Sequence, residues 1–292
     1  MKYSITHRTV YTYSSPVSDS YNDAHLCPVS DELQSCESFD LQINPGNPTP
    51  LKRLDFYTNQ VHHFEIVPPH TTLEVIASSV VETFADQRDL EVPSAHDQLN
   101  GLGTDERFYD FVNASERVSI LPMMIHEAHG LAKGSASIQE TISKVLQFIA
   151  DCFAYTPGAT NVETPVEEVF WHRKGVCQDF AHVMIALCRA LKIPARYVSG
   201  YFYSEKAIKH TADDNSESHA WVECYLPSIG WVGYDPTHNR QVNTRYVKVA
   251  VGRDYTDVRP LSGTYRGESA ARLRVEVEVD EILIPQNIRN DY

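Results

Sequence analysis

Cys177 lies where a helix is predicted to begin, directly after the segment Arg173-Lys174-Gly175. A helix N-terminus carries roughly half a positive charge and several free backbone N–H groups. A thiol in such a position ionises more readily, and the same N–H groups can stabilise the oxyanion that forms when a thiolate attacks a carbonyl. Cys177 is therefore a candidate nucleophile, although a cysteine at the start of a helix is often only structural.

Cys188 lies on the same predicted helix, 11 residues after Cys177. Three helical turns bring both side chains to one face, but the rise separates them by about 16 Å. That distance is too long for a disulfide or a shared site. Cys188 also lies among Leu187 and Leu191, so we predict that it fills the core.

A thiolate nucleophile needs a base, and the base needs a group that orients it. His219 opens the predicted strand SHAWVECYL, and Asp235 ends the next predicted strand, GWVGYD, before Pro236. If the turn pairs Tyr225 with Trp231, His219 lies diagonal to Asp235 on one face of the sheet. A register shifted by two residues pairs them directly, whereas a shift of one residue puts them on opposite faces.

The order Cys177, His219, Asp235 is that of a nucleophile, a general base and an acidic residue that holds the imidazole in one tautomer. Simpler interpretations remain open. His219 can be a strand residue bonded to a backbone carbonyl, and Asp235 can be the start of an Asp-Pro turn. Trp221 and Trp231 lie near this pair in the sequence and would help to exclude water from such a site.

Four polar residues near these positions have secondary roles in this interpretation. Gln178 and Asp179 are expected to cap the helix and to line the site. His182 lies five residues after Cys177, so it points to another side of the helix and is not its base. His238 follows Asp-Pro-Thr and is expected at the rim.

Three regions with different hydrophobic periods must position these residues. Residues 1–85 alternate bulky and polar side chains between Pro-rich turns, which predicts a small antiparallel β-sandwich. Residues 86–131 fit neither period and are predicted as a connecting region with short helices. Residues 132–292 start with helical patterns and continue with strands, the last predicted over residues 273–284. Helices followed by strands indicate an α+β domain.

The segments KGVCQDFAHVMIALCRALKIPARYVSGY and SHAWVECYLPSIGWVGYDPT resemble the transglutaminase-like superfamily, and within it the bacterial group described as cysteine proteases. FAYTPGAT, TPVEEVF and TYRG also match, so the resemblance covers residues 138–279. Residues 1–85 look like the N-terminal domain of this group, although Tyr57-Thr58 replaces the usual Phe-Gly in RLDFYTNQV.

The resemblance implies a papain-like α+β core, with helices packed on an antiparallel sheet, and acyl transfer through a thioester. It assigns the nucleophile to Cys177, the general base to His219 and the third member to Asp235. No cofactor is implied. For the oxyanion we name the backbone N–H of Cys177, and Gln178, Trp171 and Trp221 are the candidates for contacts with substrate or oxyanion.

Composition and charge exclude several classes of function. The formal net charge is −14, and the sequence contains no Lys/Arg cluster that could neutralise phosphates, so we expect no nucleic-acid partner. No run of apolar residues approaches the length of a membrane span, and the first residues contain no signal-peptide pattern, so we expect no membrane partner. The expected partner is a peptide or protein substrate.

Cysteines and histidines give no pattern typical of a metal site. The six cysteines form no C-x-x-C pair, which predicts reduced thiols in a cytoplasmic protein. His126 and His129 have i, i+3 spacing rather than the i, i+4 spacing of zinc proteases. His62, His63 and His70 have no acidic or cysteine partner at ligand spacing, so no metal is expected.

Three functions remain open from the sequence. The leading hypothesis is a cysteine-dependent hydrolase of amide, peptide or isopeptide bonds. The alternative is a protein-glutamine transglutaminase, in which an amine intercepts the same thioester. A third hypothesis is a non-catalytic interaction module that uses the β-sandwich as its binding surface.

Overall fold

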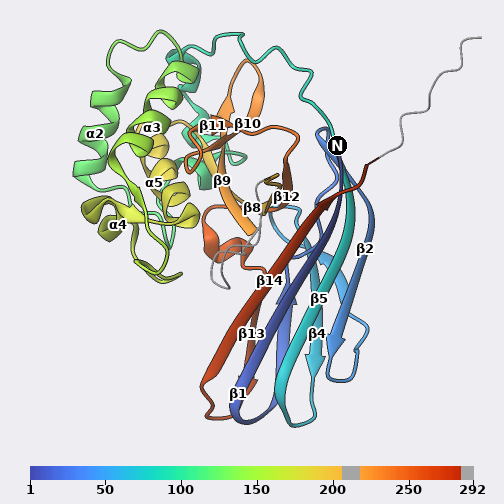
Figure 1. Ribbon diagram of the computed structural model, residues 1–292. Helices are drawn as coiled ribbons and strands as arrows, with labels where there is room; N and C mark the ends of the chain where they lie inside the picture. The colour runs from blue at the N-terminus through green and yellow to red at the C-terminus, as the bar shows by residue number, and fades with distance from the viewer. Residues whose placement is uncertain (206–217, 284–292) are drawn as a thin grey trace, which may run out of the picture.

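The computed structural model describes residues 1–205 and 218–283. An elongated β-sandwich lies beside a part in which helices pack on a second sheet (Figure 1). The predicted fold class, an α+β core preceded by an N-terminal antiparallel β-sandwich, is confirmed.

One long strand, β1 (Lys2–Ala24), belongs to both layers of the sandwich. Buried residues alternate with more exposed ones along its first half, the period of a strand with one face on a core. The pairing of β1 shifts between Thr12 and Val17, around Pro16, where the strand passes from one layer to the other. The strands that form the two layers with β1 are β2 (Gln34–Asn44), β3 (Leu51–Leu54), β4 (Gln60–Ile66), β5 (His70–Thr83), β13 (Leu261–Arg266) and β14 (Ala271–Glu281).

The end of the described chain returns to the sandwich. β14 pairs with the first half of β1, and β13 pairs with its second half. The alternation of side chains predicts a final strand over residues 273–284, as part of the region 132–292, whereas the structure begins that strand at Ala271, ends it at Glu281 and pairs it with β1. Residues 284–292 lie outside the described residues. Its partner residues lie 258 to 278 positions earlier in the chain, from Ala271 opposite Tyr13 to Glu281 opposite Tyr3, and so distant a pairing leaves no local sequence signal.

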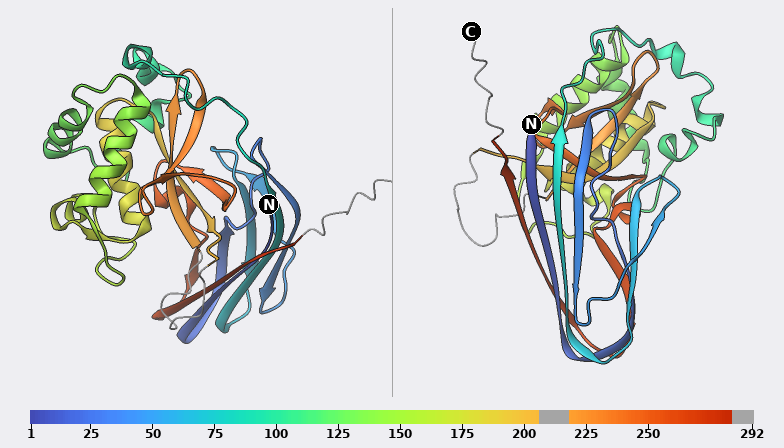
Figure 2. Two further views of the ribbon diagram at one scale, coloured as in Figure 1. Left: turned by 45° about the horizontal axis from the view of Figure 1, so that its top comes forward. Right: turned by 90° about the vertical axis from the view of Figure 1, so that its right-hand side faces the viewer.

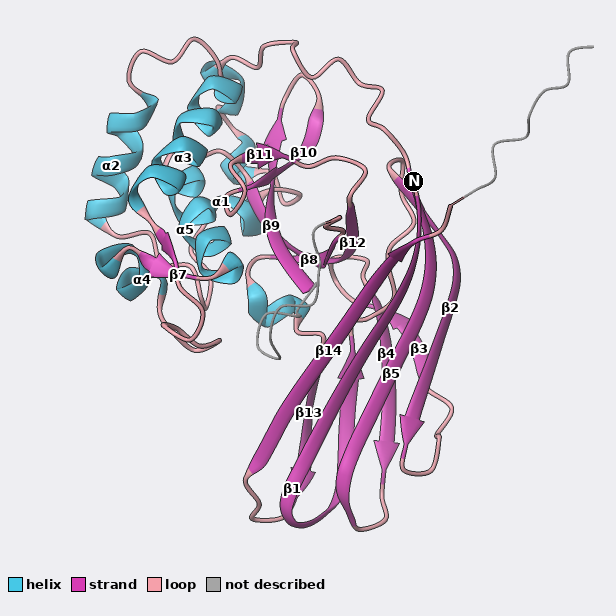
Figure 3. Cartoon of the chain, viewed as in Figure 1, coloured by secondary structure: helices cyan, strands magenta, loops and turns pink. Residues whose placement is uncertain are grey.

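The second part is built on an antiparallel sheet with the strand order β11-β10-β9-β8-β12 (Figure 3). Its strands are β8 (Ala195–Phe202), β9 (Ser218–Leu226), β10 (Gly230–Asp235), β11 (Arg240–Gln241) and β12 (Tyr246–Gly252). Its helices are α1 (Tyr109–Val112), α2 (Pro122–Ala132), α3 (Ile138–Cys152), α4 (Val166–His172) and α5 (Cys177–Ala190). None of the helices in the described part of the chain is both long and apolar enough to cross a membrane.

Helix α5 is the centre of this second part. It contacts α2, α3 and α4 on one side and β8 and β9 on the other, so every residue from Asp179 to Arg189 is buried. Cys188 is fully buried, as predicted. Arg189 is also fully buried, and its guanidinium donates hydrogen bonds to the carbonyls of Asn113, Ala195 and Arg253. This side chain therefore ties the connecting region and β8 to the end of α5.

The sandwich packs directly on the second part. Val277 and Val279 of β14 are buried in the same hydrophobic cluster as the residues of α5 and β9. The His7 ring lies 3.1 Å from the Tyr201 hydroxyl, measured from Nδ1, and burial lowers the pKa of His7 to about 4. Lys248 Nζ lies 2.8 Å from Asp31 and 2.7 Å from the buried carboxylate of Glu223. The two parts thus share both an apolar core and buried polar contacts.

Candidate active site

The local sequence explains why α5 begins at Cys177. The Asp179 carboxylate accepts a hydrogen bond from the Val176 N–H at 2.8 Å and another from Thr160 Oγ1 at 2.5 Å, so the predicted capping role of Asp179 is confirmed. A Cβ atom on Gly175 would lie 2.6 Å from Asp179 Oδ2. Gly175 is therefore required for Asp179 to reach back and close the first turn, which leaves the thiol of Cys177 at the helix N-terminus.

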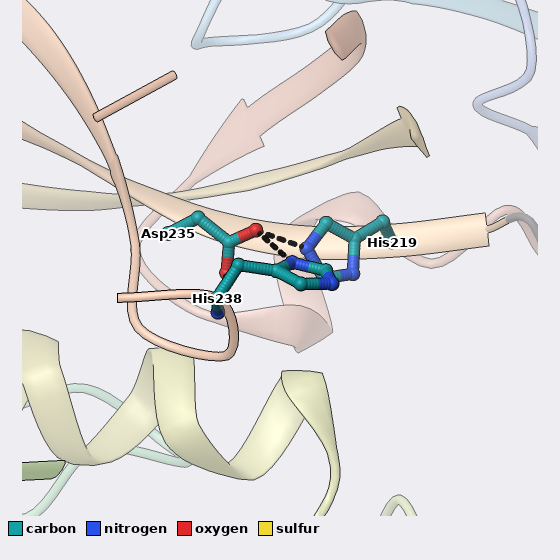
Figure 4. Close-up of side chains that lie close together, drawn as sticks. All are labelled: His219, Asp235 and His238. Atoms are coloured by element: carbon teal, nitrogen blue, oxygen red, sulfur yellow. Dashed lines mark hydrogen bonds and ion pairs between the residues drawn. The ribbon is translucent and has the colours of Figure 1, made fainter. Parts of the chain in front are cut away.

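The hairpin of β9 and β10 has the first of the registers considered from the sequence. Trp231 pairs with Tyr225, and the ladder continues to Tyr234 opposite Val222. His219 and Asp235 therefore lie diagonally on one face, and His219 Nε2 lies 2.7 Å from Asp235 Oδ2 (Figure 4). The predicted same-face arrangement is confirmed.

Asp235 is fully buried and accepts hydrogen bonds on both carboxylate oxygens. Oδ1 accepts the backbone N–H groups of Thr237 and His238 at 2.8 and 3.2 Å. Oδ2 accepts hydrogen bonds from His219 Nε2, from His238 Nδ1 at 2.6 Å and from the Tyr246 hydroxyl at 2.7 Å. Burial opposes ionisation, but the hydrogen bonds from both imidazoles outweigh it and hold the pKa of Asp235 well below its usual range. Asp235 is therefore a carboxylate that fixes three side chains.

His219 joins this carboxylate to the thiol. Burial lowers the pKa of His219, but the hydrogen bond to Asp235 and a further one to Cys177 outweigh burial and raise the pKa from 6.5 to about 10. Because Nε2 faces Asp235, Nδ1 is the ring nitrogen left to face the thiol. The structure thus brings Cys177, His219 and Asp235 together in the predicted order, with an imidazole that favours its charged form.

The remaining site residues predicted from the sequence lie around Cys177, His219 and Asp235. Gln178 is partly buried in the first turn of α5, next to Cys177. Trp171 is 70% exposed at the end of α4, just before the loop that leads to Cys177. Trp221 is buried, with its ring 6.2 Å from that of His219 and 5.4 Å from that of Tyr246. That position suits exclusion of water, as expected, and leaves Trp221 little surface for contact with substrate.

The sequence did not predict that three further residues contact Asp235 or lie beside Cys177. His238 is exposed, as expected of a rim residue, but it also hydrogen-bonds Asp235 directly, because the turn after Asp-Pro folds it back three residues. Tyr246 comes from β12, a long-range neighbour without a local signal. Tyr197 is buried beside the thiol, and burial together with the charge of Cys177 raises its pKa.

His182 is held away from the chemistry, as predicted. Its Nε2 accepts the backbone N–H of Tyr255 at 3.2 Å, and its ring lies 5.1 Å from that of Tyr197. Burial lowers the pKa of His182 to about 4, so the ring is neutral. Its acceptor nitrogen is occupied by the backbone, and it has none left to take a proton from Cys177.

One group of side chains in the described part of the chain has the composition of a metal site. Ligand atoms of His219, Asp235 and His238 lie within 4.8 Å of one another (Figure 4). Both imidazole nitrogens that face Asp235 already donate protons to Oδ2, at 2.7 and 2.6 Å. A metal would have to displace these protons and the contact that orients His219. The arrangement therefore fits a proton-linked network better than a metal centre.

Comparison with known proteins gives the context of this site. Residues 126–236 match the transglutaminase-like superfamily and include Cys177, His219 and Asp235, and residues 3–82 match the bacterial transglutaminase-like N-terminal region. An uncharacterized protein of Mycobacterium leprae is 32% identical over 282 residues, which cover 95% of this chain and 98% of that protein. A protein-glutamine gamma-glutamyltransferase of Pseudomonas aeruginosa is 36% identical over 116 residues, but these cover 38% of this chain and 17% of that enzyme.

A solved structure agrees with the fold of the whole chain. The crystal structure of a "putative cysteine protease" from Cytophaga hutchinsonii superimposes with a TM-score of 0.74 at 25% sequence identity. The match covers 98% of this chain and 93% of that protein, so it includes both the sandwich and the second part. The chain therefore belongs to the transglutaminase-like superfamily and carries the bacterial N-terminal region of that family ahead of its core.

Proposed function

We propose that this protein is a cysteine-dependent acyl-transfer enzyme in which Cys177 is the nucleophile, His219 the general base and Asp235 the residue that orients the imidazole. The observation that carries the proposal is the hydrogen bond of 2.7 Å between His219 Nε2 and Asp235 Oδ2, on an imidazole whose other partner is the Cys177 thiol. A buried carboxylate, an oriented imidazole and a thiol at a helix N-terminus are the parts that thiol catalysis needs.

The first half of the reaction forms a thioester. The thiol proton of Cys177 passes to Nδ1 of His219, which gives a thiolate beside an imidazolium. The thiolate attacks the carbonyl carbon, a C–S bond forms, and the negative charge moves to the carbonyl oxygen near the backbone N–H of Cys177. The imidazolium then gives its proton to the leaving amine as the C–N bond breaks. Gln178, the residue after Cys177 on α5, is the side-chain candidate to assist the oxyanion.

The second half releases the acyl group. Water gives a proton to His219 and attacks the thioester carbonyl, and collapse of this intermediate breaks the C–S bond and releases a carboxylic acid. If a primary amine replaces water, the same steps yield a new amide. The acceptor that reaches the thioester thus decides between a hydrolase and a transglutaminase.

Hydrolysis of a peptide or isopeptide bond is our leading candidate. The Cytophaga hutchinsonii structure described as a "putative cysteine protease" matches 98% of this chain, whereas the Pseudomonas aeruginosa transferase matches only 38%. Transglutamination is the second candidate, supported by that shorter match. We further infer a cytoplasmic location, because a reducing compartment keeps a thiol nucleophile available.

A peptide-library screen, with and without an added primary amine, tests the proposal. Cleaved peptides with a free carboxylate identify a hydrolase, and peptides joined to the amine identify a transferase. Cys177→Ser should abolish the reaction, whereas Cys152→Ser, which changes an exposed cysteine outside the site, should leave it unchanged. Activity that survives Cys177→Ser would exclude Cys177 as the nucleophile, whereas a wild-type protein without any reaction would favour the third hypothesis, a non-catalytic interaction module.

A further inference from the structure

Strand β14 leaves one edge of the sandwich unpaired. Within the part of the chain that the structure describes, β14 pairs with β1 alone. Figure 2 shows β14 at the margin of the sheet, next to β1. Leu273 and Val275 on this strand are 51% and 40% exposed. A long strand with an open backbone edge is a ready template for pairing with another strand.

The backbone of β14 shows which residues would make that pairing. Ile282 N–H donates to the Lys2 carbonyl at 2.7 Å, and Ser14 N–H donates to the Ala270 carbonyl at 3.1 Å. Hydrogen-bonded positions alternate along an antiparallel ladder, so the backbone N–H and C=O groups of the even-numbered residues of β14 point toward β1. The N–H and C=O groups of the odd-numbered residues, Leu273 and Val275 among them, therefore point toward the open edge.

The charges of β14 are complementary to those of a second copy of the same strand. Side chains of the even-numbered residues share one face, with Arg272 and Arg274 followed by Glu276 and Glu278. An antiparallel pairing centred on Val275 places each arginine opposite a glutamate of the other copy.

Other registers lose this complementarity. Centring the pair on residue 274 places two arginines opposite each other, and centring it on residue 276 places two glutamates opposite each other. A shift by one residue puts charged side chains on the apolar face. Only the register centred on Val275 pairs every charge between Arg272 and Glu278 with its opposite, with Leu273 opposite Val277 on the other face.

We propose that β14 pairs with β14 of a second copy of this chain about a two-fold axis at Val275, which makes one continuous sheet across a homodimer. Each contact in such an interface occurs twice. Glu276 already contacts Arg8 and Arg274 within its own chain. Arg272 and Glu278 form no ion pair among the described residues, so they are the side chains on which the pairing depends most directly.

Sedimentation velocity over a range of protein concentrations tests the proposal. The wild-type chain should form a dimer that weakens with added salt. Arg272→Glu or Glu278→Arg alone should raise the dissociation constant about tenfold, because each change sets like charges opposite each other at two symmetric places. The double variant Arg272→Glu/Glu278→Arg should restore the dimer, since it exchanges the charges without changing their complementarity.

Val275→Pro provides a test of the backbone contact. Its N–H faces the open edge, so proline removes a group that β1 does not use, and edge strands tolerate this change. The variant should melt as a folded protein and sediment as a monomer, whereas Thr12→Val on the neighbouring β1 should still dimerise. A wild-type chain that stays monomeric, or a dimer that survives both single charge reversals and Val275→Pro, overturns the proposal.

Discussion

Asp235→Asn is the substitution expected to disturb the site most. Oδ2 of Asp235 accepts hydrogen bonds from His219, His238 and Tyr246, while Oδ1 accepts two backbone N–H groups. An asparagine has one acceptor oxygen. If that oxygen keeps the two backbone donors, its NH₂ group meets three other donors, and two imidazoles and a phenol lose their shared partner.

The expected loss follows from the number and type of these bonds. A hydrogen bond to a charged group contributes about 1.5–3 kcal/mol, and three of them converge on Oδ2 of Asp235. Removing the buried charge offsets part of this loss of free energy, because a buried carboxylate no longer has to be desolvated. We expect the free energy of unfolding at pH 7 to fall by about 3–5 kcal/mol, the range for breaking a buried pair.

The loss should depend on pH in one direction. The pKa of His219 in the folded protein, about 10, lies above its ordinary value of 6.5. The stabilisation is therefore fully present below pH 6.5 and is lost as the pH rises through about 10. The difference in stability between wild type and Asp235→Asn should narrow over that interval.

Urea unfolding and imidazole NMR measure these two effects. Asp235→Asn should lower the titration midpoint of His219 toward 6.5 or below, because burial alone lowers it. Tyr246→Phe is the matched control: it removes one donor from the same oxygen, keeps the carboxylate, and should cost less, about 1.5–3 kcal/mol. If both variants unfold at the same urea concentration and His219 titrates alike in them, the assigned role of Asp235 is wrong.

The other predictions concern single positions around this network. Gly175→Ala should displace the Asp179 cap, since a Cβ atom there would lie 2.6 Å from Asp179 Oδ2, and should lower stability by about 1–3 kcal/mol in urea unfolding; an unchanged midpoint contradicts this. Thr58 has a φ of 67°, a left-handed conformation that strains a residue with a side chain. Thr58→Gly should therefore increase the free energy of unfolding by about 1 kcal/mol and raise the melting temperature, and a lower melting temperature would contradict this. Burial opposes ionisation of Glu223, but its cationic partners outweigh burial and lower its pKa to about 2, so its stabilisation is complete above about pH 4.5 and is lost toward pH 2; Glu223→Gln should destabilise strongly at pH 7 and little near pH 2, whereas an equal loss at both pH values refutes the assignment. His238→Asn, which can still donate to the neighbouring carboxylate, should keep more activity than His238→Ala, and equal activities would deny His238 a positioning role.

The sequence predicted the hairpin that carries the base because its signals are local. The turn between Tyr225 and Trp231 and the proline after Asp235 limited the pairing to a few registers, and the structure has one of them. The same holds for the start of α5, where Gly175 and Asp179 are neighbours along the chain.

What the sequence did not predict depends on contacts between distant segments. Tyr246 reaches Asp235 from another strand, and β14 pairs with the first strand of the chain. Arginine is a residue type that is mostly exposed in proteins, yet carbonyl groups from three separate segments surround Arg189 in the core. Such contacts can be identified only when the whole fold is known, because no residue spacing or hydrophobic period in the sequence predicts them.

The central claim is that His219 activates the thiol of Cys177, and competitive alkylation tests it most directly. Limiting iodoacetamide at about pH 6, where an ordinary thiol is almost wholly protonated, is followed by peptide mapping of all six cysteines. Cys152 is the internal control, because it is more exposed than Cys177 and lies at the end of α3, outside the site. We predict that Cys177 is labelled well before Cys152, and that His219→Ala removes this advantage. Faster labelling of Cys152 in the wild-type protein would contradict the account.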